Sequence, residues 1–408
     1  MIPYIYSFFL ILMIYVLYKA GESIKELGTI KCPAGLAAII VYTLNEGLRF
    51  GRGIDYNLYG MAYERLESGK DVNWDPSFLF LGKLFVEFGI PWQGYVMLMS
   101  FVFIVAMLIM LKGFKEIMPL ALPLFALFSL SEVENMVRWY MGFSFIMIGI
   151  SFILNNAPKC KIKFFLFSVI ACSFHIALLP IPLLFYLVFL RKTPLLAPIP
   201  AIILFFCIAL FFQSNFMMQF VELFNIFSRT SDRFEGYGDD AQYWLTGGFD
   251  GANVSALPDI QVVIFLCCLV YLGHKITITE EEDEEKEDNK GKEDNHKAIF
   301  AYNLFIVGFL LYPIANLIEL VLRFESIFIF FRAIVLAYIL KYIYREKRIT
   351  ITYGIYILSI LIFLNIGRKT LVTPFKMKPE FYMYVWDQDR HTYQSVYDSW
   401  LIEIGKGN

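Results

Sequence analysis

Long apolar runs separated by short polar segments organise the chain. Each run approaches the roughly 17–25 residues that a helix needs to cross a bilayer, so the pattern predicts about 10 transmembrane helices. We expect these helices at residues 2–18, 32–48, 92–111, 117–131, 136–154, 195–212, 258–273, 298–318, 320–340 and 349–366. Because no repeat period and no Gly/Pro-rich linker interrupts the pattern, we expect one membrane domain, residues 1–408, in an all-α polytopic integral membrane protein.

One further apolar stretch, residues 164–190, is too irregular for a single helix. It holds His175, Pro180 and Pro182 near its middle, and basic residues flank both of its ends. Both ends therefore favour the cytoplasm, and proline disfavours a continuous helix between them. The stretch predicts a short hairpin of two broken helices that turns inside the membrane near His175. Irregular backbone at that depth must line protein or a water-filled cavity.

The lysines and arginines of the short loops give the orientation. With the N-terminus outside, nearly every short basic loop lies in the cytoplasm. Residues 49–91 and 213–257 are then external loops, and the C-terminal tail, residues 367–408, is also external although it is basic. Residues 274–297 form an acidic cytoplasmic loop, whose ten acidic side chains at 280–294 predict a solvated, disordered connector.

The composition narrows the class of protein. The chain is 58% hydrophobic and 18% charged, which excludes a soluble enzyme, a secreted disulfide scaffold and a disordered protein. None of its six cysteines forms a CxxC motif. Because no metal-ligand spacing, Walker loop, dinucleotide fingerprint or serine elbow occurs, we predict no metal, no cofactor and no nucleic-acid partner.

Charged residues on the outer side have helical spacing. Arg52, Asp55 and Tyr59 are spaced to share one face of a helix. Two pairs have the favourable i, i+4 order: Glu134 with Arg138, and Glu319 with Arg323. A single pair of this kind can simply neutralise interfacial charge. Several arginines at one membrane face favour an anionic partner, because the planar guanidinium group matches phosphate oxygens.

His175 has two interpretations. A lone histidine among apolar residues is often a structural group with satisfied hydrogen bonds. At a predicted break between two short helices, a neutral imidazole can instead donate to a phosphate or take a proton near pH 7.

Five segments in order along the chain resemble motifs of the EpsG/Wzy-type polysaccharide polymerases. Residues 49–59, RFGRGIDYNLY, resemble the family's R-x-x-x-G-x-D-Y-x-x-Y signature. Residues 74–80 resemble the E-P-x-F/Y stretch, and residues 137–143 resemble R-Q-x-x-A at the head of a span. Residues 174–180 resemble F-H-x-S-x-L, and residues 233–237 resemble R-x-x-x-Y of the large external loop.

The resemblance covers residues 30–240, about half of the chain, with two departures from the family pattern. Asp75 stands where the family often has Glu, and Trp139 stands where Gln is usual. The ordered set of motifs is more specific than any one of them.

The resemblance implies a glycosyltransferase of the bacterial inner membrane with a GT-C-like architecture. Such enzymes join repeat units of O-antigen, capsule or exopolysaccharide on undecaprenyl pyrophosphate at the periplasmic face. The expected partners are this lipid-linked oligosaccharide, the bilayer and, as a further candidate, a chain-length-regulating membrane protein. The candidate pyrophosphate ligands are Arg49, Arg52, Arg138, Arg233 and Arg323, the candidate glycan contacts are Tyr56, Tyr59 and Tyr237, and the candidate catalytic bases are Asp55 and His175.

Two other functions remain open at this stage. Another GT-C-type transferase, or an O-antigen ligase, would use the same kind of site and differ only in its product. A non-enzymatic lipid or glycan transporter would need a charged path through the cytoplasmic half of the membrane, and the sequence shows none.

Overall fold

A computed structural model describes residues 2–212, 260–284, 289–315, 319–345 and 375–403 of the chain. The chain divides into two compact units, one of Met1–Arg191 with Asn365–Asn408 and the other of Lys192–Leu364. The predicted span at 349–366 and the whole of the predicted loop at 213–257 lie outside the described residues.

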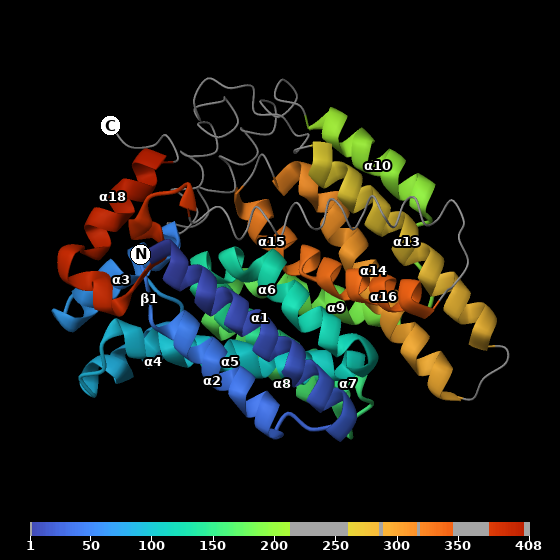
Figure 1. The fold of residues 1–408 in the computed structure, drawn as a ribbon, viewed down its shortest axis with the longest axis horizontal. Coiled ribbons are helices and arrows are strands. Elements are labelled where there is room, and N and C mark those ends of the chain that lie inside the picture. The colour runs from blue at the N-terminus through green and yellow to red at the C-terminus, as the bar shows by residue number, and fades with distance from the viewer. Residues whose placement is uncertain (1, 213–259, 285–288, 316–318, 346–374, 404–408) are drawn as a thin grey trace. The chain divides into compact units, whose positions relative to one another are not determined.

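Nine α-helices precede residue 192 in the described part of the first unit. They are α1 (Ile2–Leu27), α2 (Pro33–Gly47), α3 (Ile54–Glu67), α4 (Pro76–Glu87), α5 (Trp92–Leu111), α6 (Met118–Asn135), α7 (Val137–Leu154), α8 (Cys160–Phe174) and α9 (Pro180–Leu190). Pro33, Pro76 and Pro180 each begin a helix, where the missing N–H of proline costs no hydrogen bond. Helices α1, α2 and α5 lie side by side (Figure 1).

The second unit is also helical where it is described. Its helices are α10 (Pro198–Phe211), α13 (Ile260–Glu284), α14 (Asn289–Ala315), α15 (Glu319–Ile329) and α16 (Phe331–Arg345). The predicted acidic connector is helical at both of its ends, because α13 continues to Glu284 and α14 begins at Asn289. Glutamate and lysine are good helix formers, so solvated charge does not by itself end a helix.

The single predicted span at 320–340 is wrong in one respect, because the chain turns at Phe330 and forms α15 and α16 instead. Gly308 of α14 packs directly on the backbone before this turn: a Cβ atom at Gly308 would lie 2.7 Å from the nitrogen of Ile329. The neighbouring helix therefore contacts the main chain where α15 ends.

Five helical stretches among the described residues are long and apolar enough to cross a membrane. They are Ile2–Leu27, Trp92–Asn135, Val137–Leu154, Ile260–Thr277 and Asp294–Ala315. The second of these contains α5 and α6, joined by a 3-10 turn at Lys112–Ile117. Shorter apolar helices lie at Ile176–Leu190 and Pro198–Phe211. The predicted all-α class is confirmed, whereas the GT-C-like architecture and the count of ten spans stay predictions.

The predicted break of the stretch 164–190 into two helices that turn back near His175 is confirmed, whereas its position inside the membrane stays a prediction. Helix α8 ends at Phe174, and His175 is extended, with φ −155° and ψ 107°. A single 3-10 turn and α9 follow. The ring of Phe164 near the start of α8 stacks on that of Tyr186 near the end of α9, with centroids 6.3 Å apart, so the chain turns back on itself.

The C-terminal segment packs on the loop that follows α2. Strand β1 (Arg49–Phe50) pairs antiparallel with β2 (Met383–Tyr384), and α18 (Tyr393–Glu403) lies beside α3 (Figure 1). The indole N–H of Trp400 donates to the carbonyl oxygen of Gly51 at 2.9 Å. The segment 375–403 therefore lies on the same side of the membrane as residues 49–67.

Aromatic side chains form the core beneath this contact. The ring centroids of Trp74 and Phe78 are 4.8 Å apart, and those of Phe50 and Tyr393 are 5.1 Å apart. Both pairs belong to one buried cluster that joins α3, α4, the start of α5 and the C-terminal segment. Burying each such side chain stabilises the fold by roughly 1.5–3 kcal/mol, so this core fixes the loop that carries the charged residues.

Candidate functional site

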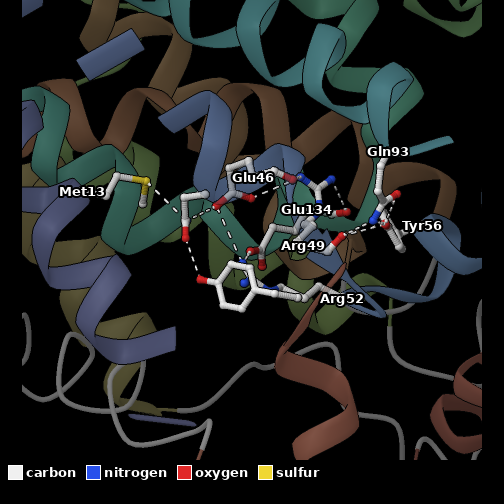
Figure 2. Close-up of polar contacts among 9 residues, drawn as sticks. Met13, Glu46, Arg49, Arg52, Tyr56, Gln93 and Glu134 are labelled. Atoms are coloured by element: carbon white, nitrogen blue, oxygen red, sulfur yellow. Dashed lines mark hydrogen bonds and ion pairs between the residues drawn. The ribbon is translucent and has the colours of Figure 1, made fainter. Parts of the chain in front are cut away.

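A buried charge cluster lies where α2 ends, and we call its four members, Glu46, Arg49, Arg52 and Glu134, the loop cluster. Figure 2 shows the carboxylates of Glu46 and Glu134 beside the two guanidinium groups. Nη1 of Arg49 donates to the Glu46 carbonyl oxygen at 2.8 Å and lies 3.2 Å from Oε2 of the same residue. Nη1 of Arg52 lies 2.8 Å from Oε1 of Glu134. Each buried charge therefore has an opposite charge beside it, as burial requires.

Arg52 is also held between two aromatic rings. Its Cζ atom lies 4.7 Å from the ring centroid of Tyr6 and 4.5 Å from that of Tyr384. Such cation–π contacts strengthen when they are shielded from water, and Arg52 is only 2% exposed. Among the described residues, nothing accepts a hydrogen bond from its Nε or Nη2 atom. Arg52 therefore keeps unused donors beneath the C-terminal segment.

Glycine shapes the loop between β1 and α3. Gly51 and Gly53 have φ values of +79° and +91°, which L side chains rarely adopt. A Cβ atom at Gly53 would also lie 2.8 Å from Cα of Asn135. The positive φ of Gly53 keeps Arg52 outside α3, so the predicted shared helical face of Arg52, Asp55 and Tyr59 is wrong.

Tyr56 and Gln93 fix the main chain of Arg49. The hydroxyl group of Tyr56 donates to the Arg49 carbonyl oxygen at 2.8 Å, and Nε2 of Gln93 donates to the same oxygen at 2.7 Å. Burial raises the pKa of Tyr56 to about 12, so its hydroxyl group remains a donor at neutral pH. Tyr56 is fully buried, and its observed contacts are internal.

A second group of polar residues, Asp75, Arg138 and His175, forms what we call the hairpin cluster. Asp75 precedes α4 at the N-cap position, but its carboxylate makes no capping hydrogen bond. Its Oδ2 atom lies 3.2 Å from Nη1 of Arg138 and 3.8 Å from Nδ1 of His175. Ser77 donates to Ser173 at 2.7 Å, which ties α4 to the end of α8.

Aromatic rings orient the members of the hairpin cluster. The ring of Tyr59 lies 5.4 Å from Cζ of Arg138, and the ring of Trp139 meets that of His175 edge to face at 5.0 Å. The Arg138 side chain is 17% exposed, against 2% for Arg49 and Arg52. In such a cluster the accessible guanidinium group can bind an anion, and the neighbouring imidazole can accept a proton.

The break between α6 and α7 joins the two clusters. Met136 has φ −91° and ψ 54°, which interrupts the helix between Glu134 and Arg138. Glu134 consequently pairs with Arg52, and Arg138 pairs with Asp75. The predicted i, i+4 pair of Glu134 with Arg138 is wrong, because that spacing brings side chains together only on a continuous helix.

The other predicted site residues are not members of either cluster as defined above, or are outside the described residues. Asp55 is in the first turn of α3, where its backbone N–H donates to Oδ1 of Asn135 at 3.0 Å. Arg323 lies on α15 in the second unit. Arg233 and Tyr237 are outside the described residues. Within the described residues, no group of three His, Cys, Asp or Glu side chains is placed to hold a metal ion.

Sequence reasoning assigned no role to several partners in the clusters. Glu46 carries a usable signal, because it is a charge in an apolar run three residues before Arg49. Gln93 and Tyr384 carry no local signal, since each reaches the cluster only through tertiary packing. The hydroxyl group of Tyr384 donates to Oδ1 of Asn45 at 2.7 Å across more than three hundred residues of sequence.

Comparison with known proteins gives one match. A family model described as the EpsG family matches residues 34–377, most of the chain. Both clusters lie inside the matched stretch, whereas Tyr384 and α18 follow it. No curated protein and no solved structure matches the chain.

Proposed function

The chain belongs to the EpsG family, and on that premise we propose that it polymerises a surface polysaccharide in the bacterial inner membrane. It is a multi-pass membrane protein, as its apolar helices and its family indicate. The proposed donor and acceptor are oligosaccharide repeat units, each carried on undecaprenyl pyrophosphate. The proposed site opens on the periplasmic face.

The observation that best supports this proposal is the hairpin cluster. It places a guanidinium group, a carboxylate and an imidazole together at the break between α8 and α9, within the matched stretch. Arg138 is the most exposed guanidinium group of the two clusters. A lipid pyrophosphate that meets Arg138 brings its glycosidic bond next to His175.

The proposed reaction is a single displacement at the donor sugar. A hydroxyl oxygen of the acceptor unit forms a bond to C1 of the sugar linked to the donor pyrophosphate. The bond between C1 and the pyrophosphate oxygen breaks, and the pyrophosphate leaves with the electron pair. Arg138 stabilises the negative charge that develops there. His175 takes the proton of the acceptor hydroxyl group.

We assign the base to His175 in preference to Asp55 because of its neighbours. The carboxylate of Asp75 lies 3.8 Å from Nδ1 of His175 and can stabilise the imidazolium that forms. Asp75 is thus a positioning residue in this proposal. The pyrophosphate roles of Arg49, Arg52, Arg233 and Arg323, and the glycan roles of Tyr56, Tyr59 and Tyr237, stay predictions.

A polysaccharide ladder tests the proposal. A deletion strain carrying the Arg138→Ala variant is expected to retain a single repeat unit and lose longer polymer. Arg65→Ala, on the exposed side of α3, is the matched control and should restore the full ladder. Polymer that accumulates on its lipid carrier would indicate a ligase instead. Loss of all surface glycan would contradict a polymerase.

A further inference from the structure

Two serines join the segments that carry the hairpin cluster. Ser77 follows Asp75 by two residues at the start of α4, and Ser173 comes two residues before His175 at the end of α8. The hydroxyl group of Ser77 donates to Oγ of Ser173 at 2.7 Å, and the hydroxyl group of Ser173 donates to the Ile170 carbonyl oxygen at 2.6 Å. Because a hydroxyl group has one proton, Ser173 accepts from Ser77 in this arrangement. We call these two hydrogen bonds the serine bridge.

The serine bridge closes a ring of contacts beside the proposed base. Opposite the bridge, Oδ2 of Asp75 lies 3.8 Å from Nδ1 of His175, which is longer than a hydrogen bond. The same Oδ2 atom lies 3.2 Å from Nη1 of Arg138, and the carboxylate makes no capping hydrogen bond to α4. The distance between this carboxylate and the imidazole therefore depends on how the start of α4 is aligned with the end of α8.

Helix α4 has other contacts that keep it folded without the serine bridge. The hydroxyl group of Tyr95 donates to the Phe78 carbonyl oxygen at 2.9 Å, and the rings of Trp74 and Phe78 have centroids 4.8 Å apart. These contacts join α4 to α5 and to the loop before α4, whereas the serine bridge joins it to α8. We therefore expect loss of the bridge to shift α4 relative to His175 and not to unfold it.

We propose that Ser77 and Ser173 are positioning residues, which hold the carboxylate of Asp75 beside the imidazole of His175. The inference rests on the proposed function and adds two residues that act on proton transfer without contacting either substrate. When His175 takes the proton of the acceptor hydroxyl group, its ring becomes an imidazolium. The attraction between this cation and the Asp75 carboxylate falls as the two groups separate, and the serine bridge limits that separation.

Alanine substitutions test the serine bridge by kinetics. The full-length protein in lipid nanodiscs is given undecaprenyl-pyrophosphate-linked repeat units isolated from the deletion strain. Ser77→Ala and Ser173→Ala should each lower kcat about fivefold, the factor expected for one lost hydrogen bond, and leave KM for the donor unchanged. The double variant should be no slower than either single variant, because both changes remove the same bond. Wild-type kcat in the single variants, or losses that multiply in the double variant, would overturn the proposal.

Two other hydroxyl groups provide matched controls. Ser168→Ala removes a hydroxyl group whose hydrogen bond, to the Phe164 carbonyl oxygen at 2.7 Å, stays within α8. Tyr95→Phe removes the hydrogen bond between α5 and α4. Both variants should retain the wild-type kcat. If either control loses as much kcat as the serine-bridge variants, the effect is a general loosening of the helices and the positioning role is wrong.

A second comparison tests whether the serine bridge acts through Asp75. In an Asp75→Asn background, Ser77→Ala should lower kcat little further, because the charge that the bridge positions is already absent. A purely structural serine would instead cost the same factor in both backgrounds. An equal loss of kcat with Asp75 and with asparagine at this position would therefore overturn the positioning role.

A disulfide tests the contact between α4 and α8 without turnover. In a cysteine-free background, Ser77→Cys with Ser173→Cys should form a disulfide under mild oxidation, because side chains at hydrogen-bond distance are within its reach. Ser77→Cys with Ser168→Cys should not, since Ser168 lies more than one helical turn earlier on α8. Failure of the first pair to link would overturn the inference.

The outcomes separate this inference from the proposed function. Polymerisation that is insensitive to Ser77→Ala and Ser173→Ala would overturn the positioning role while the polymerase proposal stands. A protein that forms the disulfide but polymerises no lipid-linked oligosaccharide would support the serine contact and contradict the polymerase.

Discussion

At the scale of single residues, the loop cluster is held by mutual neutralisation. Glu46, Arg49 and Arg52 are 1%, 2% and 2% exposed, so none of them is solvated by bulk water. Removing one partner of a buried ion pair leaves an uncompensated charge, which typically costs about 3–5 kcal/mol. The cluster therefore links the end of α2 to the end of α6, and we expect substitution of any one member to destabilise the fold.

Arg52→Lys is expected to fail almost as badly as Arg52→Ala. An ammonium group cannot bond to Glu134 and also present a flat face to the rings of Tyr6 and Tyr384. Both variants should lower the melting temperature of the purified protein and shorten its polysaccharide, whereas Arg65→Lys at an exposed position should change neither. If Arg52→Lys keeps full stability and polymer length, the planar guanidinium group is not required and the prediction is wrong.

His175→Gln separates hydrogen bonding from proton transfer. Glutamine can still donate to a phosphate but cannot accept a proton at useful pH. If His175 is the base, both His175→Gln and His175→Ala should lower kcat by about 10²–10⁴-fold while donor lipid still binds. Activity that glutamine retains and alanine loses would make His175 a binding residue and return the base to Asp55. Normal turnover by His175→Ala would make the residue structural.

At the scale of elements, the two helix breaks differ in how far the sequence predicts them. Pro180 and Pro182 predict the break at His175, because proline lacks the backbone N–H that a continuous helix needs. The break at Met136 has no proline beside it; it follows the predicted end of the span at 117–131, yet the Glu134–Arg138 spacing was still interpreted as a helical pair. The true partners of these two residues lie just before α4 and in the loop before α3, and the local sequence pattern carries no information about such tertiary pairs. Sequence reasoning therefore predicted the helical class and the hairpin but not the pairing of charges.

The start of α3 gives the third prediction. Gly53→Ala and Gly69→Ala both place a side chain at positive φ, and Gly53, with ψ 148°, adopts a conformation that is essentially confined to glycine; such strain costs about 1–3 kcal/mol. Only Gly53 also faces a close neighbour, since nothing lies within 4 Å of a Cβ atom at Gly69. Gly53→Ala should therefore lower the melting temperature further and shorten the polymer, while Gly69→Ala retains its length. Equal effects in the two variants would contradict this prediction, because neither the backbone conformation of Gly53 nor its contact with Asn135 would then add a cost.

At the scale of the whole molecule, the C-terminal segment completes the first unit. The matched family stretch ends at residue 377, yet Tyr384 covers Arg52 and Trp400 bonds to Gly51 beyond that point. The sequence assigned the tail to the outer side although its basic residues argued against it. Because β1 pairs with β2, the tail must lie on the same side of the membrane as residues 49–67. Evidence for the location of either segment is therefore evidence for the other.

Thiol labelling in intact spheroplasts tests this arrangement. In a cysteine-free background, single cysteines at Ser68 and Gln394 should both react with a membrane-impermeant reagent, because both positions are exposed on the side of the two clusters. A cysteine at Asn253, outside the described residues, should also react with the reagent in intact spheroplasts. A cysteine at Asn289 should react only after lysis. Cys32→Ser preserves the N-cap that the thiol of Cys32 gives to α2.

Each pattern of labelling has a different consequence. Reaction at Ser68 without reaction at Gln394 would contradict the packing of α18 on α3, because neighbouring helices cannot lie on opposite sides of a bilayer. Protection of both, with reaction at Asn289, would invert the topology and place Arg138 and His175 toward the cytoplasm. A polymerase that takes repeat units at the periplasmic face could not use such a site, so that result would exclude the proposed function. Reaction at Ser68, Gln394 and Asn253 but not at Asn289 would place both clusters toward the periplasm, where the proposed acceptor sugar is.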